Sequence, residues 1–167
     1  MKKIFLSAVL LILLGSSISA QNTEKQITAI RAEVAAINKS AAKYTKTTKD
    51  VEGISLEGTE ATYYVSGRGL KKVVARMYGE SYNAAGEYYY SGEELIFAFV
   101  RFNKYDRPIG SGKSPKIVKT EEQRFYFAGK NLIRLLIGKN ELKPDDERYT
   151  ELKDAVTGAS DTLKKAY

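Results

Sequence analysis

Three stretches of the chain repeat one order of aromatic, small and turn-forming residues. They are "YYVSGRGL" from Tyr63, "YYYSGEEL" from Tyr88 and "FYFAGKNL" from Phe125, with the shared pattern aromatic, Tyr, bulky, small, Gly, two variable positions, Leu. β-Forming residues precede a glycine in each, and glycine enters the positive-φ region of tight turns without steric cost. Each stretch therefore predicts a β-hairpin, and three hairpins predict an antiparallel sheet of about six strands.

The strands that return from these turns carry apolar residues at alternate positions. Because side chains of a strand alternate between its two faces, we expect this apolar face to lie against a core and the opposite face to mix aromatic with basic residues. The apolar positions are Val73, Ala75, Met77, Ala98, Val100, Phe102, Leu135 and Ile137, with Ile96 and Ile133 preceding them in the second and third copies.

Two helical patterns flank the repeats. Residues 22–44 carry apolar side chains at spacings of three and four, which predicts one narrow stripe along a helix that begins at a capping box of Thr23 and Gln26. Residues 144–166 carry a second stripe behind an acidic first turn, which suits the positive end of a helix dipole. Residues 45–58 are polar and predict a connector, with at most a short strand at 54–56. The predicted fold is α+β: an antiparallel meander sheet flanked by two amphipathic helices.

The first residues, "MKKIFLSAVLLILLGSSISAQ", have the basic, apolar and small-polar parts of a secretory signal peptide. Their apolar run is shorter than the roughly 20 residues of a membrane span, although a retained signal anchor is the alternative. Cleavage near Ala20 would place the protein in the periplasm or outside the cell. We then expect one globular domain, 21–167, made of a helix and connector (21–58), the hairpin sheet (59–143) and a closing helix (144–167).

The repeated hairpin resembles the tandem hairpin repeats of the MORN-variant type, which occur in uncharacterised exported bacterial proteins. The resemblance covers residues 63–138, where the copies begin 25 and 37 residues apart. It implies a rolled or flat antiparallel meander and no catalytic residues.

Several kinds of chemistry are excluded because the chain has no histidine and no cysteine. Without histidine the chain lacks the commonest general base and cannot form a Ser-His-Asp or Cys-His catalytic arrangement. Without cysteine it can form neither a thiolate zinc site nor a disulfide. The acidic doublets at 93–94, 121–122 and 145–146 fit a hairpin turn, a strand start and a helix start. We therefore expect no catalytic residues, no metal and no cofactor.

The stretch "RPIGSGKSPKI", residues 107–117, contains the Gly-Lys-Ser that ends a P-loop. Arg107 stands where the first P-loop glycine is needed, and Pro115 disfavours the helix that must follow Ser114. We interpret it as a basic loop that binds no nucleotide but can touch an anionic partner.

The mixed sheet face is the main functional hypothesis. The net charge of +7 favours acidic partners, and tyrosine and arginine are enriched where proteins bind one another. The alternative is that the aromatic residues only pair across strands and stabilise the sheet. The candidate residues are Tyr64, Arg76, Tyr89, Phe99, Arg101, Tyr126 and Arg134 on the sheet, and Arg107 and Lys113 in the loop.

The sequence thus predicts a secreted or periplasmic, non-enzymatic binding or structural module. Its partner would be a protein or an acidic envelope component, not nucleic acid, and it would meet a membrane only through the signal peptide before cleavage. The alternatives are a hydrolase of envelope glycan or peptide that uses carboxylates, and an inhibitor that presents loop 103–116 to an enzyme.

Overall fold

Eight strands form one antiparallel sheet in which every strand pairs with its neighbours in sequence. The computed structural model describes residues 5–67 and 69–167, with side chains from Gln21 onward. The predicted α+β meander with two helices is confirmed, but it has eight strands rather than about six. In chain order the elements are α1 (Phe5–Ser40), the 3₁₀ helix η1 (Ala41–Lys43), β1 (Thr45–Val51), β2 (Thr59–Ser66), β3 (Gly69–Gly79), β4 (Tyr82–Ser91), β5 (Glu94–Tyr105), β6 (Ile117–Ala128), β7 (Asn131–Ile137), β8 (Asn140–Leu142) and α2 (Glu147–Ala166).

The two additional strands are the edges of the sheet. β1 has the sequence TKTTKDV and occupies part of the predicted connector, whereas residues 54–56 lie in the loop after it. Most of β1 is exposed, so it shows no apolar alternation, although its threonines suit a strand. β8 has three residues and pairs with β7. Polar or very short edge strands escape a search for hydrophobic periodicity.

Each repeated hairpin contains a β-bulge close to its turn. The extra residue always lies in the returning strand, and in the second and third copies it is Ile96 and Ile133. The bulge turns these side chains toward the α1 side, whereas Ala98 and Leu135 face α2. The prediction of one face for all four residues is therefore wrong. The register shifts fall between Tyr64 and Val65, Tyr89 and Tyr90, and Tyr126 and Phe127.

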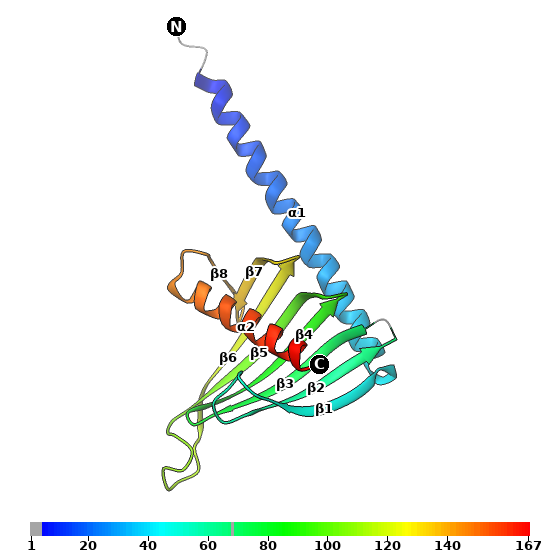
Figure 1. The fold of residues 1–167 in the computed structure, drawn as a ribbon. Coiled ribbons are helices and arrows are strands. Elements are labelled where there is room, and N and C mark those ends of the chain that lie inside the picture. Colours follow the sequence, from blue (N-terminus) through cyan, green and yellow to red (C-terminus); the bar gives the residue numbers. More distant parts are fainter. Residues whose placement is uncertain (1–4, 68) are drawn as a thin grey trace.

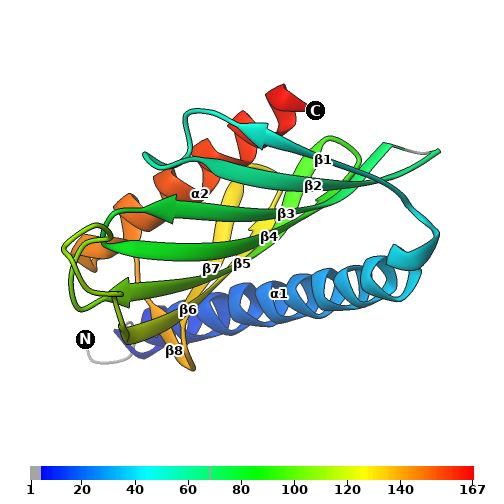
Figure 2. The same ribbon diagram turned by 90° about the horizontal axis from the view of Figure 1, so that it is seen from below.

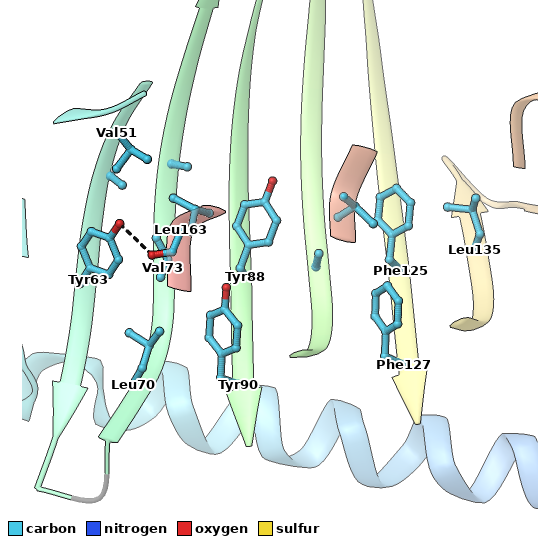
Figure 3. Packing of buried hydrophobic residues seen from close by; sticks show 14 residues of the cluster. Val51, Tyr63, Leu70, Val73, Tyr88, Tyr90, Phe125, Phe127, Leu135 and Leu163 are labelled. Atoms are coloured by element: carbon cyan, nitrogen blue, oxygen red, sulfur yellow. Dashed lines mark hydrogen bonds between the residues drawn. The ribbon is translucent and has the colours of Figure 1, made fainter. Parts of the chain in front are cut away.

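The two helices cover opposite faces of the sheet (Figure 2). We call these the α1 face and the α2 face. On the α1 face, Ile27, Ile30 and Ile37 are buried against Tyr89 and Tyr126, the second residues of the second and third repeats. On the α2 face, Val156 and Leu163 are buried against the aromatic residues at the first and third positions (Figure 3). Both predicted helical stripes therefore pack on the sheet.

Hydrogen bonds hold the C-terminal half of α2 to the sheet. Tyr63 Oη donates to the carbonyl oxygen of Leu163 at 3.1 Å, and Tyr90 Oη lies 3.1 Å from Ser160 Oγ. At the other end, α2 begins later than residue 144, because Asp146 is the N-cap and accepts from the backbone N–H of Arg148 at 2.9 Å.

The two ends of the sheet are built differently. The turns that join β2 to β3, β4 to β5 and β6 to β7 lie at one end, which we call the turn end. α1 crosses the strands there, behind Leu70, Tyr90 and Phe127 in Figure 3. The other end, the ribbon end, carries loops 52–58, 80–81 and 106–116, and the last of these projects farthest (Figure 1).

The predicted signal peptide overlaps the start of α1. Residues 1–4, and the side chains of the rest of that segment, lie outside the described residues. Thr23 lies within α1 rather than at its start. The ion pair between Glu24 and Arg134, at 2.6 Å, and the buried stripe from Ile27 onward follow the predicted cleavage near Ala20. Cleavage would therefore leave these contacts intact. No helix in the described part of the chain is long and apolar enough to cross a membrane.

Candidate functional site

Two tyrosines of the predicted binding face are buried beneath α1. Tyr89 is 2% exposed and Tyr126 is 4% exposed. Arg31 of α1 lies 5.5 Å from the ring centre of Tyr126 and donates from Nε to its hydroxyl at 3.4 Å. Both rings belong to the packing between helix and sheet, so they are not accessible to a partner.

Tyr89 also belongs to a polar cluster under the C-terminal end of α1. Lys72 Nζ donates to Asn38 Oδ1 at 3.0 Å, to Glu87 Oε2 at 2.6 Å and to Tyr89 Oη at 2.9 Å. Burial alone would lower the pKa of Lys72, but the hydrogen bonds and charge interactions with Glu87 and Tyr89 outweigh it and raise that pKa. All three donors of the ammonium are used within the protein. The cluster therefore links α1 to β3 and β4 and offers no free group to a ligand.

Arg134 and Tyr64 are half-buried and also engaged. Arg134 pairs with Glu24 of α1 at 2.6 Å and with Glu141 of β8 at 3.6 Å. The hydrogen bond with Glu24 raises the pKa of Arg134, so its charge is secured. The ammonium groups of Lys46 and Lys72 lie 5.3 and 5.9 Å from the ring centre of Tyr64. These residues join neighbouring elements rather than form a free surface.

The exposed part of the α1 face has paired charges. Arg76 binds Glu60 at 2.8 Å, and Arg101 binds Glu122 at 2.9 Å. Arg101 also lies 5.8 Å from the ring centre of the half-buried Phe99. Hydrogen bonds from Arg101 and Arg124 lower the pKa of Glu122. This surface is locally neutralised, so it attracts an acidic partner weakly.

The two loop candidates lie apart from the sheet candidates. Arg107 and Lys113 are exposed in loop 106–116 at the ribbon end. Arg107 Nη2 donates to Asp106 at 2.9 Å, and the same carboxylate accepts from the backbone N–H of Lys116 at 2.9 Å. The nine predicted residues therefore fall in three places: beneath α1, on the exposed part of the α1 face, and in this loop.

A cavity of about 780 Å³ lies on the α2 face toward the ribbon end. Its floor comes from inward-facing residues of β3 to β6, and its roof comes from α2. Residues from Arg148 to Thr162 of α2 line the cavity, and the hydrogen bonds of Tyr63 and Tyr90 hold the C-terminal half of this helix to the sheet beside it. Its apolar lining includes Met77, Ala84, Tyr88, Val100, Phe102, Phe125, Leu152, Val156 and Ala159.

Small residues on β4 shape the cavity floor. Ala84 lines it directly, and Gly86 lies two positions along on the same face. A Cβ atom at Gly86 would come within 2.7 Å of the Tyr88 ring and 3.2 Å of Met77 Cε. Gly86 thus lets the Tyr88 ring lie flat along the floor, since a side chain would displace it.

Tyr88 supplies a polar group within this apolar floor. Its side chain is buried, and burial raises the pKa of its hydroxyl, which therefore stays protonated. The hydroxyl points away from Tyr90 and α1, toward the ribbon end (Figure 3). It has no hydrogen-bond partner among the residues that the structure describes, so it can donate to a ligand.

The cavity has a charged side at the ribbon end. The Glu121 carboxylate accepts from Arg148 at 2.6 Å, Gln123 at 2.9 Å and Lys119 at 3.2 Å. Burial raises the pKa of Glu121, but these three hydrogen bonds outweigh it and lower that pKa. Lys104 adds a further cation to this side. Three cationic groups thus border the cavity near the Glu121 carboxylate, and Glu151 and Asp154 of α2 line it as well.

The structure does not bring the residues of an acidic doublet together as a catalytic pair. Glu121 faces the cavity, whereas Glu122 points to the other face and binds Arg101. Glu93 and Glu94 are exposed at the turn end. Among the described residues no group of three or more acidic, histidine or cysteine side chains could hold a metal ion.

Sequence reasoning did not single out the cavity residues as a site. The available indication was "NAAGE", residues 83–87, because small residues on an inward-facing strand leave a core underfilled. Comparisons of the chain with known protein families, with curated proteins and with solved structures found no match.

Proposed function

We propose that this is an exported, non-enzymatic binding protein that holds an amphipathic small molecule between its sheet and α2. The cavity of about 780 Å³ is the observation that supports this function. Ligand sites are typically concave, about 300–1,000 Å³ in volume, and mostly apolar with a few placed polar groups. Met77, Ala84 and Phe102 give the apolar floor, and the Tyr88 hydroxyl is one such polar group.

The charged side of the cavity favours a ligand with an acidic end. Glu121 already engages Lys119 and Arg148, whereas Lys104 makes no ion pair among the described residues. Glu151 and Asp154 of α2 also line the cavity, so the free cation is confined to the side formed by β5 and β6. A compound with an aliphatic or aromatic body and one carboxylate, sulfonate or phosphate would place its body on the floor and its anion at this side.

This proposal moves the binding site from the sheet face to the cavity. Tyr89 and Tyr126 are beneath α1, and the exposed arginines already bind carboxylates. The lack of histidine and cysteine supports a binding role rather than catalysis. The signal-peptide pattern supports export to the periplasm or beyond.

The test is a fluorescence titration of the exported, purified protein with anilinonaphthalene sulfonate, which has an aromatic body and one anionic group. We expect saturable binding that Ala84→Phe weakens at least about tenfold, because the new ring fills the floor. Ala85→Phe is the matched control, since Ala85 is exposed on the opposite face.

Circular dichroism and thermal denaturation must show that both variants are folded, because disordered cores also bind this dye. If Ala84→Phe does not fold, Gly158→Phe obstructs the cavity from α2, where an added Cβ meets nothing within 4 Å. Equal dye binding by the wild type and a folded cavity variant would disprove the proposal. If the cavity variant loses dye binding, mass spectrometry of an organic extract of the purified wild-type protein would identify a retained natural ligand.

A further inference from the structure

The strands β5 and β6 extend past their neighbours and form a projecting ribbon, residues 104–119 (Figure 1). Three of its aliphatic side chains are exposed to solvent: Ile109 by 55%, Ile117 by 54% and Val118 by 61%. A single exposed aliphatic residue is ordinary, but a cluster of them is typical of an interaction site.

Exposed apolar side chains are concentrated at the ribbon end of the molecule. Of the six large apolar residues that are exposed in the described part of the chain, three are in the ribbon, and Leu56 and Tyr78 lie at the same end. The sixth, Tyr167, is the last residue. The turn end, by contrast, has its large apolar residues under the two helices.

The ribbon is also strongly basic. Asp106 is its one acidic residue, and that carboxylate is already bound by Arg107 and by the backbone N–H of Lys116. Glu52, Glu57 and Glu80 lie at the same end but in the other two loops. The excess of positive charge therefore belongs to the ribbon itself. Its basic residues are Lys104, Arg107, Lys113, Lys116 and Lys119.

The base of the ribbon is anchored. The Asp106 carboxylate joins its two strands through the bond to Lys116, and the backbone N–H of Ile109 donates to the carbonyl oxygen of Glu80 at 2.8 Å. These bonds fix where the exposed aliphatic and basic groups stand relative to the sheet. Pre-ordered groups lose less conformational freedom on binding.

We propose that the ribbon docks on the surface of a bilayer that contains anionic phospholipids. Ile109, Ile117 and Val118 would enter the boundary between head groups and acyl chains, and the lysines would bind lipid phosphates. Exposed aliphatic groups surrounded by cations match a surface that is anionic outside and apolar beneath. This peripheral contact differs from the sequence-based expectation that only the signal peptide meets a membrane.

Docking would also orient the cavity. Lys104 and Lys119 belong to the ribbon and line the charged side of the cavity. A docked ribbon therefore brings that side close to the bilayer, where amphipathic compounds are concentrated. The docking surface itself consists of exposed residues, so it does not depend on whether the cavity is occupied.

The test is co-sedimentation of the exported, purified protein with vesicles. We expect binding to vesicles of phosphatidylglycerol with phosphatidylcholine, little binding to phosphatidylcholine alone, and loss of binding in high salt. The double variant Lys113→Glu, Lys116→Glu should bind the anionic vesicles at least about tenfold more weakly. Replacing Ile109 and Ile117 with serine should weaken binding at low salt too.

The matched control is Lys25→Glu, Lys130→Glu, which makes the same charge change at exposed positions on α1 and at the turn end. This control should lose no more than a small part of the binding. Docking is disproved if the control loses as much as the ribbon variant, if neutral vesicles bind equally well, or if the folded ribbon variants bind like wild type. Ala84→Phe should keep vesicle binding while losing dye binding, so the two proposals fail separately.

Discussion

The turn end and the ribbon end of the sheet are formed by the same strands but differ in how their side chains are packed. At the turn end, α1 and α2 bury aromatic residues on both faces, with Tyr89 on one and Tyr90 on the other. At the ribbon end, the floor is partly uncovered and apolar side chains are exposed. The buried aromatic packing is thus concentrated at the turn end, and the same continuous strands form the floor of the cavity at the other end.

The difference follows from where the large residues stand along each strand. The repeated pattern places two or three bulky residues directly before each turn. Farther along β4, the inward positions are Gly86 and Ala84, and β6 has Gln123 there. On β4 and β6 the inward side chains therefore become smaller away from the turns, and the cavity borders these positions.

The largest expected effect is the loss of an aromatic side chain from the filled end. Tyr90→Ala should lower the free energy of unfolding by about 3–5 kcal/mol, because it leaves a cavity and removes the contact with Ser160. Phe102→Ala should cost clearly less, since Phe102 is half-exposed and already borders a cavity. Urea denaturation measures both. Equal costs would show that the two ends do not differ in packing.

A smaller effect is expected from glycines in the two kinds of loop. Gly92 and Gly112 both have positive φ, 59° and 86°. Gly92→Ala should cost about 1–2 kcal/mol, because the turn between β4 and β5 is short and held by paired strands. Gly112→Ala should cost less, since Gly112 lies at the tip of the ribbon, beyond the bonds of Asp106 and Ile109 that anchor its base. Thermal unfolding compares the two, and a larger loss for Gly112→Ala would contradict this view of the ribbon.

Over the cavity, a stabilising change of about 1 kcal/mol is expected from Gly158→Ala. Alanine has the higher helix propensity, and its Cβ would meet nothing within 4 Å. The free energy of unfolding should rise while dye binding is unchanged, because a methyl group occupies little of the cavity. Ala155→Gly, at an exposed position of the same helix, should have the opposite effect on stability. A loss of stability in Gly158→Ala would mean that α2 lies closer to the sheet.

The smallest effect concerns pH and the cluster at the turn end. Burial alone would raise the pKa of Glu87, but hydrogen bonds from Lys72 and Tyr89 outweigh it and lower that pKa below its ordinary 4.5. This group therefore stabilises the fold above about pH 4.5, and the contribution disappears as pH falls through the lowered pKa. Because Glu87 is partly exposed, screening limits the contribution to at most about 1 kcal/mol.

Unfolding free energies of wild type and Glu87→Gln, measured from pH 7 to pH 3, test this contribution. The two curves should converge at the acidic end. Glu60→Gln removes the exposed ion pair with Arg76 and is the control. A constant difference between wild type and Glu87→Gln across the range would exclude a role for the carboxylate charge.

Local patterns predicted the meander, both helices and the stripes that they bury. They did not predict β1, whose polar residues lie at an edge, or the bulges that move Ile96 and Ile133 to the other face. A bulge adds one residue to a strand, so side chains on the two sides of the bulge no longer alternate in the same phase. Strict alternation therefore fails where the bulge occurs, although the repeat itself placed all three bulges at equivalent positions.

The candidate site was harder to predict than the fold. Because consecutive side chains of a strand point to opposite faces, the sequence predicts Tyr89 and Tyr126 on the outer face, and they do face away from α2. α1 covers that side, which a strand pattern alone does not reveal. The cavity depends on the distance between α2 and the floor, and that distance is set by bonds such as Tyr90 to Ser160, which are 70 residues apart.

The meander connectivity has a consequence for the order of folding. Every strand pairs with the strand before or after it, so the sheet can grow hairpin by hairpin through contacts that are close in sequence. Sheets with such local contacts fold faster than those that join distant segments. Both helices are exceptions: α2 bonds to Tyr63 and Tyr90, and the buried residues of α1 contact β4 to β7. The helix nearest the amino terminus is thus expected to dock late, after the strands that receive it have assembled.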